Sequence, residues 1–399
     1  MFVPKTSLTV IGQTSSGIPK CGKCGLYRTC KSPKMEPHGK GRKGILIVGE
    51  APGEQEDRDG IQFTGKTGKT LQRVLASHDI DMRKDCWTTN ANICRPPNNE
   101  TPNDKLIGYC RPTLIKTIQE LNPTVIILLG GNAVKSLIGK YWRRSIGGIT
   151  RWRGWRIPHR DLNTWICPTF HPSYIEHMDN RVVSRMFSQD LQAAVALNER
   201  PYAERPNDEI KIIIDADKAT RWLHRIKDGD TIAFDFESNP LKPDRDGSYI
   251  VSCSVCKNGI WTIAFPWYGS VVAAMKRILK NPKIKKIGSN IKHEHRWCKR
   301  ILDIEVKGWY LDTMLMAHTL DSRGKITSLK FQAFVRLGVN DYSAHIEPYL
   351  ETKGGNEWNK IKQIDLPSLL QYNGYDSLYE YQVAMYQLEE IENGANSAN

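Results

Sequence analysis

The chain has 399 residues, which is enough for two domains or three. Its 57 Lys and Arg exceed its 43 Asp and Glu, giving a formal net charge of +14. A phosphate backbone is the commonest reason for such a bias, and a basic surface that only aids solubility is the alternative. Ten cysteines are too few for a disulfide scaffold and suggest a metal or cluster site in a reducing compartment. The sequence shows no apolar run of membrane-spanning length and no signal-peptide pattern at its start, so we expect no contact with a membrane.

The first half of the chain alternates short apolar strands with helical stretches. We expect a loose leader over 1–18, then strands at 44–48, 125–129 and 164–167 and helices at 69–77, 102–121 and 181–197. Such alternation predicts a parallel sheet with helices on both faces, a three-layer α/β domain over 19–198. The polar segment 199–208 carries two prolines and reads as a linker.

The second half places its strands before most of its helices. Strands are expected at 231–237, 249–256 and 260–265, followed by helices at 270–279, 293–301, 312–320 and 366–390. This order predicts a second α/β domain over 209–390, with a mixed sheet backed by helices. Residues 391–399 are expected to form a polar tail.

The most informative segment is GEAPGEQEDRDGIQFTGKTG at 49–68, directly after an apolar strand. A Gly/Pro turn between a strand and a helix exposes backbone N–H groups and can bind an anion or a base. Spaced cysteines accompany it, with Cys21 and Cys24 in a C-x2-C motif and Cys94 and Cys110 downstream. Their spacing is compatible with Zn or with an iron–sulfur cluster and does not choose between them; unconnected free cysteines are the third possibility.

Four motifs in order resemble the family 4 uracil-DNA glycosylases: Cys21-x2-Cys24-Gly-Leu, GEAPGEQED with GIQFTG, TN-x3-CRPP around Cys94, and TFHPS around His171. The resemblance covers roughly 19–198 and implies a [4Fe–4S] cluster held by Cys21, Cys24, Cys94 and Cys110. Cys30 stands where many family members have Arg, which leaves the ligand choice slightly open. Cys86 and Cys167 read as buried core thiols.

The first half of the chain also offers the groups that base excision requires after the base is flipped from the stack. Phe63 offers a flat face to the pyrimidine, Asn90 a donor and an acceptor for the uracil edge, and His171 a donor to the anion on the leaving base. Glu50 and the backbone at Gly49 and Gly53 are expected to position water and phosphate, and Tyr174 and Ile175 to fill the emptied stack. Ala51 stands where family 1 enzymes carry a water-activating Asp, so a DNA-binding or docking module without activity is the alternative.

Carboxylates suited to metal ions lie in the second half. Asp235 and Glu237 share one face of a strand, Glu294 follows Asn290 at the start of a helix, and Tyr372 and Asp376 stack at i,i+4 within another helix. Acids from a strand and two helices can bind a pair of Mg²⁺ ions that act on a phosphodiester.

These motifs resemble the DEDDy 3′–5′ exonucleases, the proofreading domains of family A DNA polymerases, over roughly 209–390. The resemblance implies two Mg²⁺ or Mn²⁺ ions held by Asp235, Glu237, Glu294 and Asp376, with Tyr372 orienting the attacking water. Glu294 departs from the usual Asp. Asp312 is expected to cap a helix.

Further candidates have plainer explanations. Cys253 and Cys256 lie in a strand and are expected to be core thiols, and His293 and His295 to be surface residues or DNA-backbone contacts. Aromatic and basic residues interleave at 141–144 and 151–156, which suits contact with phosphate and bases. A twisted β-ribbon with half-buried tryptophans explains the same pattern.

The two halves together resemble the front part of certain phage family A DNA polymerases. We expect a DNA-processing protein of the host cytoplasm, acting on uracil-containing DNA and on single-stranded or frayed 3′ ends. It is expected to work alone in repair or beside a separate DNA polymerase, because no polymerase domain fits after residue 390.

Overall fold

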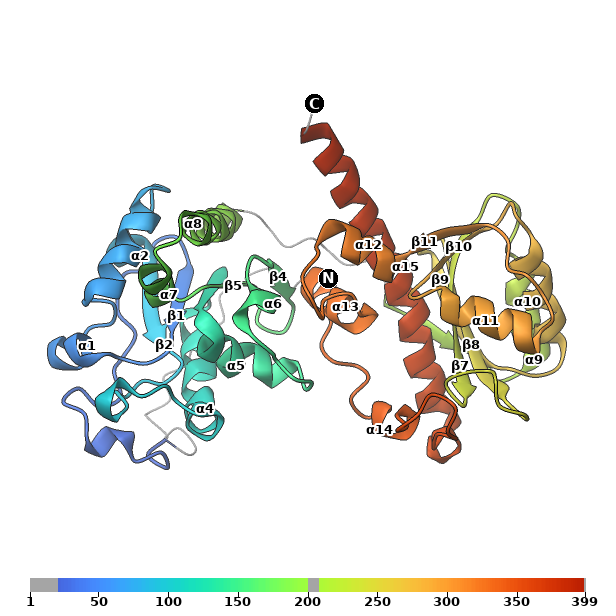
Figure 1. Cartoon of the computed structure of the whole chain (residues 1–399), viewed down its shortest axis with the longest axis horizontal. Coiled ribbons are helices and arrows are strands. Elements are labelled where there is room, and N and C mark those ends of the chain that lie inside the picture. The colour runs from blue at the N-terminus through green and yellow to red at the C-terminus, as the bar shows by residue number, and fades with distance from the viewer. Residues whose placement is uncertain (1–20, 200–207, 398–399) are drawn as a thin grey trace. The chain divides into compact units, whose positions relative to one another are not determined.

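The computed structural model describes residues 21–199 and 208–397; the expected leader and most of the expected linker lie outside these ranges. The chain divides into two compact units, Met1–Glu204 and Arg205–Asn399. Each unit is built around its own sheet (Figure 1). None of the helices in the described ranges combines the length and hydropathy that a bilayer crossing requires.

The sheet of the first unit has five strands in the order β2-β1-β3-β5-β4. They are β1 Ile45–Gly49, β2 Cys86–Asn90, β3 Val125–Leu129, β4 Ile157–His159 and β5 Thr164–Thr169. The predicted parallel arrangement is confirmed for β2, β1, β3 and β5. Only the edge strand β4 runs antiparallel, against β5.

Helices cover both faces of this sheet, so the predicted three layers are present. The helices are α1 Glu54–Asp59, α2 Lys66–Ala76, α3 Met82–Asp85, α4 Asp104–Leu121, α5 Gly130–Tyr141, α6 Ile149–Trp152, α7 Pro172–Met178 and α8 Arg181–Val195. Leu71 of α2 and Phe187 of α8 pack on one face with Ile45 and Ile127, while α5 packs on β1 and β3 beside α4. The strands β1 and β3 are buried along their whole length, as expected for a sheet covered twice.

The segment 151–156 does not form a β-ribbon, which was one of the two explanations of its sequence pattern. Residues Ile149–Trp152 form the short helix α6. Trp152 is completely buried and donates its indole N–H to the Ile146 carbonyl over 2.6 Å, and Trp142 is buried beside it. Both rings belong to the core, so neither is available to stack on a DNA base.

The sheet of the second unit has six strands in the order β11-β10-β7-β8-β9-β6. They are β6 Ile210–Ile212, β7 Thr231–Asn239, β8 Tyr249–Lys257, β9 Trp261–Pro266, β10 Lys285–Gly288 and β11 Trp309–Asp312. Strands β7, β8 and β9 form an antiparallel meander, and β10 and β11 add in parallel on the other side of β7. This is the mixed sheet of a ribonuclease H-like fold.

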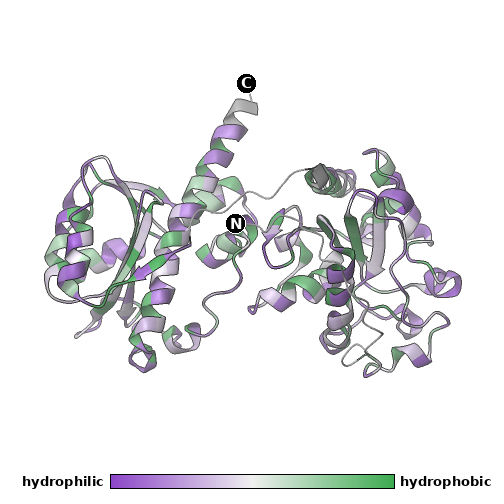
Figure 2. Ribbon diagram, turned by 180° about the vertical axis from the view of Figure 1, so that it is seen from behind, coloured by the Kyte–Doolittle hydropathy of each residue, from purple (hydrophilic) through white to green (hydrophobic). Residues whose placement is uncertain are grey.

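Helices lie on both faces of this sheet as well. They are α9 Ala216–Leu223, α10 Ser270–Lys280, α11 Lys292–Ile301, α12 Thr313–Leu320, α13 Leu329–Leu337, α14 Glu347–Leu350 and α15 Leu366–Ser397. One core joins α9, α10 and α11 to Phe234 and Phe236 of β7, and the other joins α13 and α15 to Ala233. Figure 2 shows green, apolar segments along the strands of both units.

The last helix is longer than predicted. The sequence predicts its end at Glu390 and a polar tail after it, but α15 continues to Ser397. Helix propensity does not explain this extension, because Asn393, Gly394 and Asn396 are poor helix formers and Gly394 alone costs about 1 kcal/mol.

Candidate functional site

The predicted uracil-pocket residues meet where the parallel strands of the first unit end. Gly49, the last residue of β1, lies in register with Asn90, the last residue of β2. Leu129 of β3 is in register with Thr169 of β5, two residues before His171. The carboxyl edge of a parallel sheet is the usual place for a binding site, and here it collects motifs from four strands.

Gly49, Phe63 and Asn90 are in direct contact. A Cβ atom added at Gly49 would lie 2.4 Å from Asn90 Oδ1 and 2.8 Å from Phe63 Cζ. Only glycine therefore fits at position 49 with both side chains in place. The ring and the amide lie beside the same point of the backbone, as readout of a flat base with polar edges requires.

The backbone of Phe63 is held in an uncommon conformation. Its φ is +56°, in the left-handed region that bulky residues seldom adopt. Its carbonyl accepts hydrogen bonds from Arg83 Nη2 at 3.1 Å and Gln72 Nε2 at 3.3 Å. Backbone conformations of this kind cluster at binding sites, where the surrounding structure imposes them.

Glu50 lies just past the end of β1, where the backbone N–H of Asn92 donates to the Glu50 carbonyl. Burial raises the pKa of the Glu50 carboxyl, against the hydrogen bonds of Thr101 and Asn132 and the charge of Lys135, which lower it. Polar neighbours thus hold the carboxyl just past the end of β1.

His171 is the N-cap of α7 and is largely enclosed. Its Nδ1 accepts the Ser173 backbone N–H at 3.3 Å and lies 2.7 Å from Ser173 Oγ. Burial lowers the pKa of His171 to about 4, against the charges of Glu176 and Glu56, which raise it. The imidazole is therefore neutral at pH 7, and because Nδ1 accepts, the ring proton is assigned to Nε2. A neutral donor at Nε2 is the group that a developing oxyanion needs.

The segment after His171 divides between surface and core. Tyr174 is exposed and stacks near Phe170 at 5.1 Å between ring centroids. Ile175 instead packs against the core of the first unit. Of the two predicted wedge residues, Tyr174 is exposed and Ile175 is half-buried.

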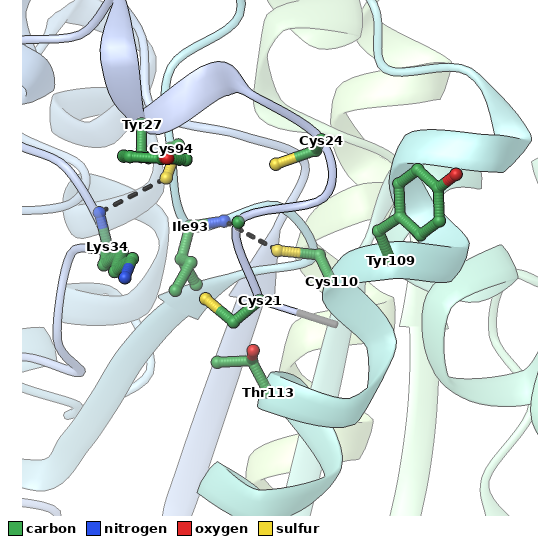
Figure 3. A pocket seen from close by; sticks show the side chains of 10 residues that line it. Cys21, Cys24, Tyr27, Lys34, Ile93, Cys94, Tyr109, Cys110 and Thr113 are labelled. Atoms are coloured by element: carbon green, nitrogen blue, oxygen red, sulfur yellow. Dashed lines mark hydrogen bonds between the residues drawn. The ribbon is translucent and has the colours of Figure 1, made fainter. Parts of the chain in front are cut away.

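Four cysteines converge on one small pocket. Cys21 and Cys24 come from the loop before Leu26, Cys94 from the loop after β2 and Cys110 from α4, and Figure 3 shows their side chains around the same space. The Lys34 N–H donates to Cys94 Sγ at 3.3 Å and the Ile93 N–H to Cys110 Sγ at 3.5 Å. Burial raises the pKa of the Cys94 thiol to about 12 and that of Cys110 to about 11. At Cys94 and Cys110 a thiolate would thus form only with a bound cation. N–H donors already point at these two sulfurs, which suits an iron–sulfur cluster.

The remaining cysteines of this unit fall outside that pocket's lining. Cys30 packs against the small apolar cluster that contains Cys94 and Cys110. Cys86 and Cys167 are buried in the main core, as predicted, as are Cys253 and Cys256 in the second unit.

Three carboxylates of the second unit form a compact group. Asp235 and Glu237 of β7 and Asp376 of α15 each place a carboxylate oxygen within 4.8 Å of the others. They line an open cavity of about 570 Å³ together with Tyr372 and His293. Burial and the charge of Asp376 raise the pKa of Asp235 to about 8, and burial and Asp235 raise that of Glu237 well above its ordinary value. Buried acids this close repel one another, and a multivalent cation relieves that repulsion.

Glu294 lies outside this compact group. It is buried on α11, its pKa is raised by burial and by Asp235, and its Oε2 has no hydrogen-bond partner within the described ranges. Asp312 accepts the backbone N–H groups of Asn290 and Ile291 at the start of α11 and caps α12. The predicted helix-cap role of Asp312 is confirmed, and this residue also anchors the helix that carries Glu294.

Several residues around the acids were not singled out from the sequence. Asn373 Nδ2 donates to Asp235 Oδ2 at 2.7 Å. Lys330 and Tyr342 both donate to Asp376. Glu380 is buried with its Oε1 bonded to the Ser289 N–H. Only Glu380 left a sequence signal, since it continues the four-residue spacing of Tyr372 and Asp376.

Both units match known families. Residues 36–195 match the uracil DNA glycosylase superfamily, and residues 210–385 match a 3′–5′ exonuclease family. The type-4 uracil-DNA glycosylase of Saccharolobus solfataricus is 32% identical over 188 residues, covering 46% of this chain and 85% of that protein. The corresponding enzyme of Thermotoga maritima is 33% identical over 181 residues, covering 45% of this chain and 90% of that protein. Through its first unit, the chain belongs to the type-4 uracil-DNA glycosylase family.

A longer relative spans both units. The DNA polymerase of Bacillus phage SP01 is 26% identical over 331 residues, 74% of this chain but only 34% of that polymerase. The type-4 glycosylase unit is thus joined to a 3′–5′ exonuclease unit in a chain that resembles about a third of a phage polymerase. The chain is a DNA-processing enzyme built from two enzyme families.

Proposed function

We propose that the first unit excises uracil from DNA and that the second unit removes nucleotides from DNA 3′ ends with divalent metal ions. The convergence of Asp235, Glu237 and Asp376 beside Tyr372 in one open cavity carries the second part. The contact of Phe63 and Asn90 at Gly49, with neutral His171 on the same sheet edge, supports the first. Proofreading or repair, alone or with a separate DNA polymerase, is the proposed setting.

In the first unit each side chain has a separate task. Phe63 stacks on the flipped uracil and Asn90 bonds its polar edge, while Gly49 allows both to approach. His171 donates from Nε2 to the oxygen on which charge develops as the glycosidic bond breaks. A water that Glu50 positions forms the new bond to the sugar carbon, and the proton it gives up neutralises the uracil anion. Cys21, Cys24, Cys94 and Cys110 would hold a [4Fe–4S] cluster that ties the N-terminal loop to α4.

In the second unit Asp235, Glu237 and Asp376 would hold two Mg²⁺ or Mn²⁺ ions, with Glu294 reaching the site from α11. Such ions would supply charge stabilisation for the attacking and leaving oxygens of a phosphodiester. Burial and Asp376 raise the pKa of Tyr372 well above its ordinary value, so its hydroxyl stays protonated. Tyr372 therefore orients the attacking water by hydrogen bonding and does not act as a base.

One experiment tests both activities. Anaerobically purified protein is incubated with a 5′-labelled single strand carrying one internal uracil, in EDTA or in Mg²⁺, beside a matched thymine strand. We expect an abasic site at the uracil in EDTA and shortening from the 3′ end of both strands in Mg²⁺. An intact uracil strand in EDTA would recast the first unit as a binding or docking module. Absence of shortening in Mg²⁺ and Mn²⁺ would contradict the nuclease assignment.

A further inference from the structure

A largely buried lysine contacts one of the acids of the proposed metal site. Lys330, in the first turn of α13, places its Nζ 2.7 Å from Asp376 Oδ1 and 2.8 Å from Oδ2. Within the described ranges the ammonium has no other hydrogen-bond acceptor. It lies over the rings of Tyr342 and Tyr372, 5.6 Å and 5.0 Å from their centroids. Its side chain is 17% exposed.

This position is unfavourable for a lysine without a specific partner. A cation in the first turn of a helix opposes the helix dipole, and a buried ammonium loses its hydration. Asp376 compensates both costs, since it faces the charge with both oxygens. In return, the ammonium offsets the repulsion among Asp376, Asp235 and Glu237 when no metal ion is bound.

The same oxygens cannot serve two cations equally well. Asp376 belongs to the group whose carboxylate oxygens lie within 4.8 Å of one another, and Lys330 bonds both of its oxygens. A divalent ion on Asp376 would face the ammonium at close range, where like charges repel strongly in a buried site. The flexible four-carbon stem of lysine allows the ammonium to swing away.

We propose that Lys330 is a positioning residue that occupies Asp376 in the metal-free protein and competes with the divalent ion for it. Lys330 keeps the acidic site folded before metal binds, and it releases at least one oxygen of Asp376 on loading. Tyr342 stays in place throughout, because its neutral hydroxyl bonds Asp376 without opposing a cation. The inference rests on the proposed metal-dependent function of this site.

The test measures Mn²⁺ affinity of the full chain by the electron paramagnetic resonance signal of free Mn²⁺, together with thermal unfolding with and without Mn²⁺. The variants are Lys330→Met, which removes charge and donor, and Lys330→Gln, which removes the charge and keeps a donor. We expect both to bind Mn²⁺ about tenfold more tightly than the parent protein. Their metal-free Tm should fall, and the gain in Tm on adding Mn²⁺ should exceed that of the parent.

Lys286 supplies the matched control. It is also buried in the second unit, but its ammonium bonds the Asn281 carbonyl and, within residues 21–199 and 208–397, no acid. Lys286→Met should leave Mn²⁺ affinity and the Mn²⁺-induced gain in Tm unchanged. A general effect of losing a buried lysine would instead appear in both positions.

The outcomes separate this inference from the function on which it rests. Unchanged or weaker Mn²⁺ affinity in both Lys330 variants, with normal binding by the parent, would overturn the competition alone. If the parent protein binds no Mn²⁺, the metal site and the inference with it would be overturned. The same holds if the double variant Asp235→Asn/Glu237→Gln binds Mn²⁺ as tightly as the parent protein.

Discussion

At the scale of single residues, the two candidate sites differ in charge: the first contains a neutral histidine, and the second contains a group of acids. His171 is enclosed and neutral, with its Nδ1 occupied by Ser173, so its remaining ring N–H is its contribution. Asp235, Glu237 and Asp376 are instead crowded carboxyl groups whose mutual repulsion a cation would relieve. Burial thus keeps His171 neutral in the first site, and in the second site it makes repulsion among the acids costly unless a cation is bound.

The buried histidine predicts a pH-dependent stability of the first unit. The pKa of His171 is about 4 when folded, against about 6.5 for an unfolded histidine. The unfolded chain therefore takes up a proton first, and stability is lost as pH falls from 6.5 towards 4. His171→Asn keeps an N-cap oxygen for the Ser173 N–H. Its Tm should fall less than that of the parent over this interval, as measured by calorimetry; an equal fall would contradict the assignment.

The acid pair predicts a selective loss of nuclease activity. Asp235→Asn combined with Glu237→Gln keeps the size of both side chains and removes their charge. Degradation from the 3′ end in Mg²⁺ should drop by more than about 100-fold, because loss of a group that only supports a metal ligand already costs about 10- to 100-fold. Uracil release in EDTA should be unchanged. Degradation at the parent rate would show that these acids do not hold the metal.

At the scale of elements, the first site lies where parallel strands end, and the second lies on the interior of β7 and of α15. The carboxyl edge of β1, β2, β3 and β5 gathers the residues of the proposed uracil pocket. In the second unit, Asp312 at the end of β11 holds the start of α11, and α15 presents Tyr372, Asp376 and Glu380 at four-residue intervals. Rigid elements place these side chains more accurately than free loops would.

The close contact at the end of β1 predicts a sensitive glycine. Gly49→Ala would place a Cβ 2.4 Å from Asn90 Oδ1 and 2.8 Å from Phe63 Cζ, which forces the two side chains apart. Uracil release should fall by about tenfold or more, because a displacement of about 1 Å can cost 100-fold in rate. Gly131→Ala, whose Cβ would meet nothing within 4 Å, is the control and should keep full activity. Full activity in Gly49→Ala would show that uracil release does not depend on this contact.

At the scale of the whole molecule, the two compact units have separate cores and separate sites. Each proposed cofactor would bind groups of one unit only, the cluster at four cysteines of the first and the metal ions at acids of the second. Ligand binding stabilises the unit that binds it. The stabilities of the two units should therefore respond independently.

Calorimetry of the full chain tests this independence. Two unfolding transitions are expected; Mn²⁺ should raise only the transition of the second unit. Cys94→Ala should lose the brown chromophore and lower only the transition of the first unit. Cys86→Ala, at a buried thiol of the main core, should retain the iron. Full iron retention in Cys94→Ala would show that Cys94 does not bind the cluster.

The sequence alone determined the features that depend on local spacing. Alternation along β7 places Asp235 and Glu237 on one face and Phe236 in the opposite core. The i,i+4 spacing within α15 puts Tyr372 and Asp376 beside the same cavity. The order of strands and helices predicted the class of both sheets, because fully apolar runs and period-two alternation leave few other arrangements.

Only the tertiary structure decided which distant residues meet. Lys330 and Tyr342 reach Asp376 across 46 and 34 positions of sequence, and no local pattern encodes such a contact. The sequence left contact with DNA and partial burial both open for the tryptophans at 142 and 152. Both are buried, Trp142 directly after α5 and Trp152 at the end of α6. Glu294 lies on the expected helix but outside the compact acid group. Local periodicity sets which face a side chain occupies, whereas the packing of whole elements sets what stands opposite that face.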